Sequence, residues 1–173
     1  MHVAFTGNGK GKTTAAIGNA IRIIGADKRA LMVQFIKGPW VSGEDKFAER
    51  LGPDFRIIKT GKGFVGILGD KLPLEEHKEA AEEGLRVAKK EIASGSWHLL
   101  ILDEIHNAIT LGLIGTAQVI AFLDYAKGKV EHVITTGRDA PKEIINHADL
   151  VTEMKEIKHP YQTGRFAEKG LDF

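Results

Sequence analysis

Short apolar runs alternate with amphipathic stretches along this chain. The runs have the length and residue types of strands, and they cover residues 2–6, 30–36, 55–59, 98–104, 131–136 and 150–157. The run at 30–36 is nearly continuously apolar, which suits a parallel strand buried on both faces. Between them, apolar residues recur at helical spacing in the stretches 12–24, 44–51, 73–95, 116–126 and 141–147. Strands that alternate with helices are typical of a parallel sheet with helices on both faces. The pattern therefore predicts an α/β fold with a mostly parallel sheet.

Residues that start and stop helices stand at the boundaries of this pattern. Gly25 follows the first helical stretch, Ser42 can cap the helix at 44–51, and Pro141 can open the last helix. Residues 60–72 hold four glycines and show no regular period. We therefore expect a loop there, at the carboxyl end of a strand, where ligand sites are common.

The sequence GNGKGKTT lies between the first predicted strand and the first predicted helix. Its three glycines allow the backbone to curl so that successive N–H groups converge on an anion, and the helix adds the positive end of its dipole. This context predicts a phosphate-binding loop for a nucleoside triphosphate. The residues expected to bind it are Gly7, Asn8, Gly9, Lys10, Gly11, Lys12, Thr13 and Thr14.

Two side chains of this loop carry specific expectations. Lys12 supplies a positive charge for the outer phosphates, and the hydroxyl of Thr13 can bind a divalent metal ion. The loop departs from the usual G-x-x-x-x-G-K-[ST] spacing, because Thr6 stands where the first glycine belongs. A plain glycine-rich turn is the alternative, but the strand before the loop and the helix after it favour phosphate binding.

A second chemical signal ends the apolar run at 98–104. Asp103 and Glu104 follow four apolar residues, a pattern that in phosphate-loop proteins faces the metal ion. An apolar run followed by two carboxylates is common by itself. Combined with the loop near the amino end, it predicts that Asp103, Glu104 or both bind the metal ion together with Thr13.

Composition narrows the function classes. The 173 residues fit one domain, 1–173, that can bury roughly 70% of its unfolded surface. A net charge of +1 without a long basic run argues against nucleic acid and an anionic membrane surface. No cysteine is present, and no apolar run reaches the about 20 residues of a membrane helix. We expect a cytoplasmic protein whose seven scattered histidines are ordinary surface or core residues.

Taken together, these motifs resemble the phosphate-loop class of ATP:corrinoid adenosyltransferases, and the resemblance covers nearly the whole chain. It rests on GNGKGKTTAA at 7–16, VQFIKG at 33–38 with Trp40 and Gly43-Glu44, TGKGF at 60–64, LDE at 102–104, TGR at 136–138, and HPYQTG and GLDF in the tail. The short glycine loop is the form in which that family carries its phosphate-loop motif.

The resemblance implies an activity and an architecture. Members transfer the 5′-deoxyadenosyl group of ATP to the Co(I) of a reduced corrinoid and release triphosphate, in adenosylcobalamin biosynthesis or salvage. A RecA-like phosphate-loop fold, a homodimer, Mg²⁺ or Mn²⁺, and a flavoprotein or similar reductant are implied as well. ATP would lie reversed in the loop, so that the ribose 5′ carbon faces the attacking cobalt. The tail, residues 159–173, would pack near the site.

The same resemblance assigns roles to individual residues. Lys12, Thr13 and Glu104 would be the catalytic residues, because they stabilise the charge that grows on the leaving triphosphate. Phe64 would lie beside the corrin and help to displace its lower axial ligand, although a loop aromatic that fills the core is the alternative.

Two further assignments stay open at this stage. Trp40 would contact the corrin or pack against the protein, with the two roles equally favoured. Arg138 would bind a phosphate or ribose oxygen, or form a surface ion pair. Two departures from the family are visible: Gly66 stands where many members have an aromatic, and many members have an N-terminal extension before the first strand.

Two other function classes compete with this interpretation. An ordinary phosphate-loop kinase or ATPase would transfer the γ-phosphate, with Glu104 activating the acceptor. Thymidine-type kinases have a similar loop, but often a cysteine zinc site that this chain cannot form. A non-catalytic nucleotide-dependent module would bind ATP without turnover.

Overall fold

A parallel sheet forms the centre of the molecule. The computed structural model describes residues 1–38, 40–63, 65–66, 69–164, 167–168 and 170–171. Within them a six-stranded sheet has the order β3-β2-β4-β5-β1-β6, and all of its neighbouring strands run parallel. The strands are β1 His2–Thr6, β2 Ala30–Gln34, β3 Phe55–Lys59, β4 Leu99–Asp103, β5 His132–Thr136 and β6 Leu150–Glu153.

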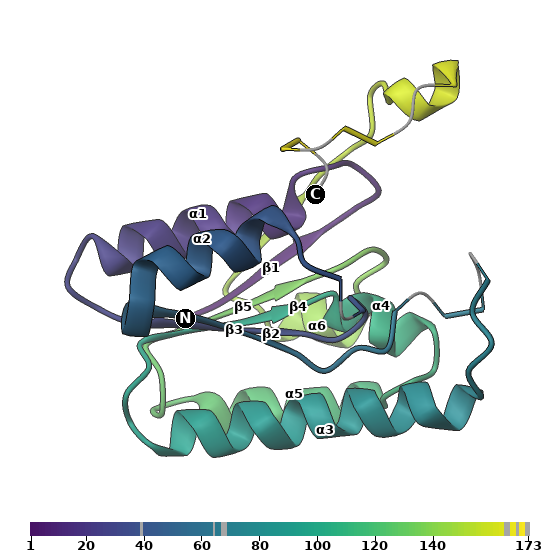
Figure 1. Cartoon of the computed structure of the whole chain (residues 1–173). Helices are drawn as coiled ribbons and strands as arrows, with labels where there is room; N and C mark the ends of the chain where they lie inside the picture. Colours follow the sequence, from purple (N-terminus) through teal and green to yellow (C-terminus); the bar gives the residue numbers. More distant parts are fainter. Residues whose placement is uncertain (39, 64, 67–68, 165–166, 169, 172–173) are drawn as a thin grey trace.

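Helices cover both faces of this sheet (Figure 1). α1 (Lys12–Ile24) and α2 (Gly43–Leu51) lie on one face. α3 (Leu74–Ala93) and α5 (Thr116–Ala126) lie on the other. The shorter helices are α4, Ile105–Thr110, and α6, Lys142–His147, and two 3₁₀ turns cover Gly52–Asp54 and Pro160–Thr163. The predicted α/β fold, a RecA-like phosphate-loop architecture with helices on both faces, is confirmed.

Successive side chains of the strands feed two separate cores. In β2, Ala30 and Met32 join the cluster that contains Ala16 and Ala20 of α1, whereas Leu31 and Val33 join the cluster under α3 and α5. These four side chains are fully buried, as is the fifth residue of β2, Gln34. Because neighbouring side chains of a strand point to opposite faces, a strand covered on both sides is apolar wherever its side chains pack against the helices. This is why the strands could be recognised as continuous apolar runs.

The structure shortens two of the expected strands and adds one helix. β2 ends at Gln34 instead of residue 36, and β6 ends at Glu153 instead of residue 157. β6 is short because the next residue, Met154, accepts a hydrogen bond from the N–H of Gly9 at 2.7 Å, so the chain there pairs with the phosphate loop. α4 was not predicted. It spans six residues and has no side-chain hydrogen bond at its N-cap, so it lacks a sequence signal.

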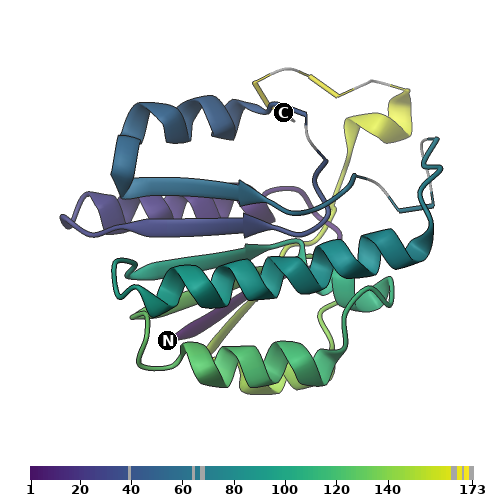
Figure 2. The ribbon, with the colours of Figure 1, turned by 60° about the horizontal axis from the view of Figure 1, so that its bottom comes forward.

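The carboxyl ends of the strands meet at one edge of the sheet. Parallel strands place the loops after β1, β2, β4 and β5 side by side there, and the last described segments of the chain reach the same edge (Figure 2). None of the described helices is both long and apolar enough to cross a membrane.

At the opposite edge of the sheet, His2 is buried among polar partners. Its Nε2 lies 3.0 Å from Thr135 Oγ1 and its Nδ1 lies 2.9 Å from His147 Nδ1. Burial and, next, the neighbouring His147 lower the pKa of His2 to about 4. The folded protein therefore keeps this imidazole neutral well below the pH at which an exposed histidine takes up a proton.

We predict that His2 makes the stability depend on pH. The unfolded chain binds a proton near pH 6.5 and the folded chain only near pH 4, so the free energy of unfolding should fall as pH drops through this window, by roughly 1–3 kcal/mol from this group. Denaturant unfolding at several pH values would measure it. His2→Gln should show a shallower fall, and an unchanged slope would contradict the assignment.

Candidate active site

The phosphate loop between β1 and α1 depends on its glycines. Gly7 and Gly11 have φ angles of 97° and 114°, in the region that favours glycine. Gly9 is required for another reason, because a Cβ there would lie 2.8 Å from the carbonyl oxygen of Met154. The loop thus rests directly on the backbone that follows β6. This packing gives the loop a defined shape at the start of α1.

Lys12 is the first residue of α1 and lies over this loop. Its Nζ donates hydrogen bonds to the carbonyl oxygens of Gly7 at 2.7 Å and Gly9 at 2.8 Å. Burial lowers the pKa of Lys12, while the nearby carboxylate of Glu104 acts in the opposite direction. The ammonium group is held where the phosphates of a nucleotide in the loop would lie.

Asp103, the last residue of β4, connects several elements through its buried carboxylate. Its Oδ1 accepts hydrogen bonds from Thr13 Oγ1 at 2.8 Å and Thr136 Oγ1 at 2.7 Å. Its Oδ2 accepts one from Gln34 Nε2 at 3.0 Å. The side chain has no exposed surface. Asp103 therefore fixes the hydroxyl of Thr13 and links β4 to α1, β5 and β2.

Glu104 turns away from this network toward the open side. It has a φ of 64°, and its backbone N–H donates to Thr136 Oγ1 at 3.0 Å. Burial and, next, the adjacent Asp103 raise the pKa of Glu104 to about 7, although Lys12, Lys37 and Arg138 oppose this shift. Three cations from three different segments of the chain therefore act on one carboxylate.

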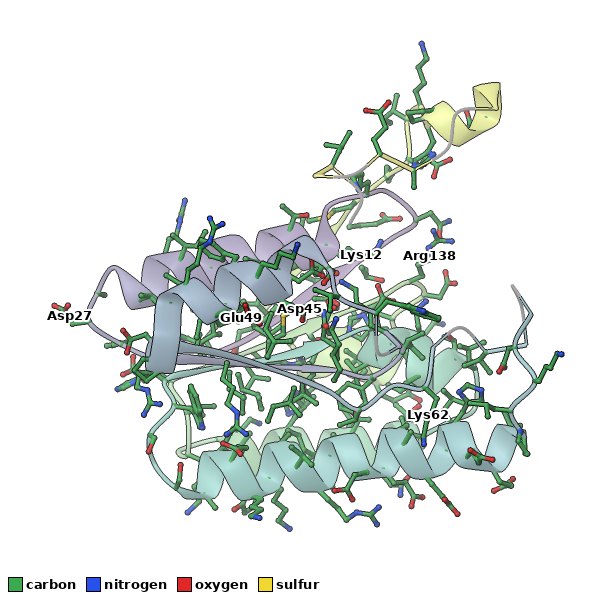
Figure 3. All side chains as sticks on the ribbon, viewed as in Figure 1. Lys12, Asp27, Asp45, Glu49, Lys62 and Arg138 are labelled. Atoms are coloured by element: carbon green, nitrogen blue, oxygen red, sulfur yellow. The ribbon has the colours of Figure 1, made fainter. Side chains whose placement is uncertain are left out.

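The start of α4 holds the turn that carries Arg138. Gly137 has a φ of 140°, and a Cβ there would lie 2.6 Å from Asn107 Oδ1. The same Oδ1 accepts a hydrogen bond from the backbone N–H of Arg138 at 2.7 Å. Figure 3 shows Arg138 beside Lys12 at the carboxyl edge of the sheet, with Asp27 at the far edge. Among the described residues, no carboxylate forms an ion pair with the Arg138 guanidinium.

A cavity of about 860 Å³ lies against the phosphate loop. Its wall includes residues 9–14 of the phosphate loop and α1, together with Glu104 and Arg138. Lys37 and Glu44, which follow β2, complete the charged part of the wall, and His159, Gly170 and Leu171 of the tail lie along it. The structure thus brings together most of the residues that the sequence assigned to nucleotide and metal binding.

Other expected site residues lie elsewhere. Gly7 shapes the loop without lining the cavity, and Asn8 is exposed. Trp40 is 63% exposed, and its ring lies against Gly38 and Gly63, so the loops after β2 and β3 pack together through it. Phe64 lies outside the described residues, and its proposed corrin contact stays a prediction.

The oxygen atoms near Lys12 fit a divalent cation of the magnesium type. Thr13 Oγ1 donates its proton to Asp103, which leaves its lone pairs available, and the Glu104 carboxylate lines the cavity. Among the described residues, no group of three or more His, Cys, Asp or Glu side chains gathers around a common point. Mg²⁺ and Mn²⁺ fit such a site, because Mg²⁺ commonly uses one or two protein ligands plus substrate phosphates and water.

Sequence reasoning missed several residues of this site. Gln34 and Thr136 lie in predicted strands and in the quoted motifs VQFIKG and TGR, but nothing there indicates that they bond to Asp103. Asn107 lies in α4, which the pattern does not predict. Lys37 and Glu44 belong to the quoted motifs, but nothing in their spacing showed that they meet. The one available signal was polar residues at the carboxyl ends of buried strands, since an uncharged polar side chain there needs a partner.

We predict that a methyl group on Gly9 weakens nucleotide binding. Gly9→Ala places the Cβ against the backbone of Met154 and Lys155, so the loop must shift, and we expect ATP affinity to fall by about tenfold or more. Gly18→Ala is the matched control, because a Cβ in α1 meets no atom within 4 Å there.

The control should keep ATP affinity and raise the free energy of unfolding by roughly 0.5–1 kcal/mol. Isothermal titration with ATP and denaturant unfolding would measure both variants. Equal ATP affinity in Gly9→Ala and the unaltered protein would contradict the proposed role of the close approach.

Comparison with known sequences agrees with this site. The sequence model of the ATP:corrinoid adenosyltransferase family BtuR/CobO/CobP matches residues 1–173. A corrinoid adenosyltransferase of Escherichia coli (strain K12) is 35% identical over 171 residues, which are 99% of this chain and 84% of the relative. One from Sinorhizobium sp is 37% identical over 172 residues, 99% of this chain and 79% of the relative.

A solved structure shares the fold at low sequence identity. The flagellar accessory protein FlaH of Methanocaldococcus jannaschii superimposes with a TM-score of 0.56 and 12% identity, over 88% of this chain and 69% of its own. At that identity the likeness concerns the fold alone. The sequence relatives go further, and the resemblance inferred from the motifs is confirmed: the chain belongs to the ATP:corrinoid adenosyltransferase family.

Proposed function

We propose that this enzyme transfers the 5′-deoxyadenosyl group of ATP to the Co(I) of a reduced corrinoid and releases triphosphate. The observation that carries the proposal is the family match across residues 1–173, since a phosphate loop alone serves many reactions. The match favours this reaction over the kinase or ATPase alternative. We place the enzyme in adenosylcobalamin biosynthesis or salvage.

The chemistry asks for positioning and charge stabilisation. The Co(I) electron pair forms the bond to the ribose 5′ carbon, the bond from that carbon to oxygen breaks, and its electron pair leaves on the triphosphate. The reaction requires no proton transfer, so no general base is needed. The protein must align the two reacting atoms and stabilise the charge on the leaving group.

Residues around the phosphate loop meet these needs. Lys12 and the loop N–H groups would bind the triphosphate, and Arg138 would bind a phosphate or ribose oxygen. Thr13 and Glu104 would hold Mg²⁺ or Mn²⁺, which neutralises part of the triphosphate charge when it is bound. Because Asp103 is occupied by three hydrogen bonds, we assign it the orientation of Thr13.

The remaining assignments concern the corrinoid and the assembly. We propose that ATP lies reversed in the loop, with its 5′ carbon toward the open side of the cavity. Trp40, exposed beside the loop after β3, and Phe64 would contact the corrin. A homodimer, a flavoprotein or similar reductant and a cytoplasmic location stay predictions from the sequence.

Product analysis tests the proposed reaction. The protein is incubated with ATP, Mg²⁺ and chemically reduced cobalamin, and the products are separated. Inorganic triphosphate together with a light-sensitive Co–C bond in equal amounts is the expected result. ADP and phosphate as products would support the kinase or ATPase alternative, and bound ATP without turnover would support a binding module.

We also predict that Lys12→Ala abolishes turnover. The substitution removes the ammonium held over the phosphate loop, and we expect the rate of adenosyl transfer to fall by about 100-fold or more. Lys28→Ala is a suitable control, because Lys28 pairs with Glu131 outside the cavity. Single-turnover formation of the Co–C bond would measure both, and a Lys12→Ala enzyme with normal turnover would refute the assignment.

A further inference from the structure

Two neighbouring residues of α2 each form an ion pair with a lysine at or just after the end of a strand. Glu44 Oε1 is bonded to Lys37 Nζ, which follows β2. Asp45 Oδ2 is bonded to Lys59 Nζ, at the end of β3, at 2.5 Å. Both pairs connect α2 to the sheet, yet they stand in different surroundings. The difference indicates a function for one of them.

The Lys59–Asp45 pair holds α2 against the end of β3. Lys59 also donates a hydrogen bond to the carbonyl oxygen of Trp40 at 2.7 Å, and Asp45 accepts hydrogen bonds from the backbone N–H and the hydroxyl of Ser42. Neither Lys59 nor Asp45 lines the nucleotide cavity. This pair therefore joins α2, its N-cap and the loop after β2.

The Lys37–Glu44 pair instead forms part of the cavity wall. Both residues line it, and their side chains are 34% and 14% exposed. Burial opposes the charge on Lys37, but Asp103 and the bonded Glu44 outweigh it and hold the pKa of Lys37 above its usual value. The ammonium group is thus charged at neutral pH and open to a ligand in the cavity.

The position of Lys37 complements that of Lys12. Lys12 opens α1 directly after the phosphate loop and Arg138 comes from the loop after β5, whereas Lys37 follows β2. All three act electrostatically on Glu104, at the end of the central strand β4. β4 lies between β2 and β5 in the sheet. A polyanion in the cavity would therefore meet Lys37 on the β2 side of β4 and Arg138 on the β5 side.

We propose that Lys37 is a further phosphate-binding residue of this enzyme, and that its ammonium turns from Glu44 to the triphosphate when nucleotide binds. A triphosphate carries several negative charges against one on Glu44, so the exchange is electrostatically favourable. Glu44 keeps the flexible lysine side chain at the cavity beforehand and is a positioning residue. The proposal rests on the proposed adenosyl transfer.

In that reaction Lys37 would act most strongly at the transition state. The bond between the 5′ carbon and oxygen breaks, and its electron pair adds negative charge to the triphosphate, while the cobalt electron pair forms the new bond. A cation beside the leaving group gains attraction as this charge grows. Loss of Lys37 should therefore lower kcat as well as the affinity for ATP.

Lys37→Met and Lys59→Met form a matched pair for the test. Each removes one ammonium and keeps an apolar stem, and each breaks one ion pair to α2. The affinity for inorganic triphosphate with Mg²⁺, measured by isothermal titration, is the first readout. We expect Lys37→Met to weaken it by about tenfold or more and Lys59→Met to leave it within about twofold.

Two further variants separate charge from fold. Lys37→Arg should recover most of the triphosphate affinity, because it keeps the charge. If Lys37→Met does not fold, Lys37→Gln replaces it, since its amide can still bond to Glu44. Unchanged triphosphate affinity in the neutral Lys37 variant, or an equal loss in both members of the matched pair, would overturn the proposal.

The kinetic readout distinguishes this proposal from the proposed function. With reduced cobalamin, the neutral Lys37 variant should show a higher KM for ATP and a kcat lower by about tenfold or more. Triphosphate binding needs no corrinoid, so it tests Lys37 even if the protein transfers no adenosyl group. Loss of triphosphate affinity with ADP as the product would refute the adenosyl transfer and keep the phosphate contact.

Discussion

The carboxylate of Asp103 is the interaction on which the site depends. It has no contact with solvent, and its two oxygens accept three side-chain hydrogen bonds from three different elements. A buried charge is tolerated only when such donors replace water. The same bonds set the position of Thr13 at the start of α1. The same three hydrogen bonds therefore stabilise the buried charge and align the site.

The two adjacent carboxylates at the end of β4 differ in their surroundings. Asp103 is satisfied inside the protein, whereas Glu104, one residue on, faces the cavity with cations around it. The positive φ of Glu104 makes this separation possible, because it turns the chain out of β4 before α4 begins. Two adjacent carboxylates thereby acquire different environments. One orients protein groups, and the other is available to a cation or substrate.

Much of the fold can be predicted because its signals lie within short stretches of the sequence. Ala30, Leu31, Met32 and Val33 of β2 are apolar because both faces of the strand pack against helices. The phosphate-binding motif is continuous in sequence, so its residues stand at fixed spacing. Contacts between distant segments carry no such signal. The bond from Gln34 to Asp103 spans 69 residues and depends on the order of the strands. α4 could not be predicted, because it begins at a backbone turn at Glu104 and has no side-chain cap that the sequence would reveal.

The contact between the phosphate loop and the end of β6 makes the sheet edge part of the nucleotide site. Gly9 is bonded to Met154, and all four residues of β6 are exposed on the outermost strand. Local opening of β6 would remove the support of the phosphate loop. A ligand that requires the loop in this shape therefore also stabilises the state in which β6 is paired with the sheet. By thermodynamic reciprocity, nucleotide occupancy and protection of β6 from hydrogen exchange rise and fall together.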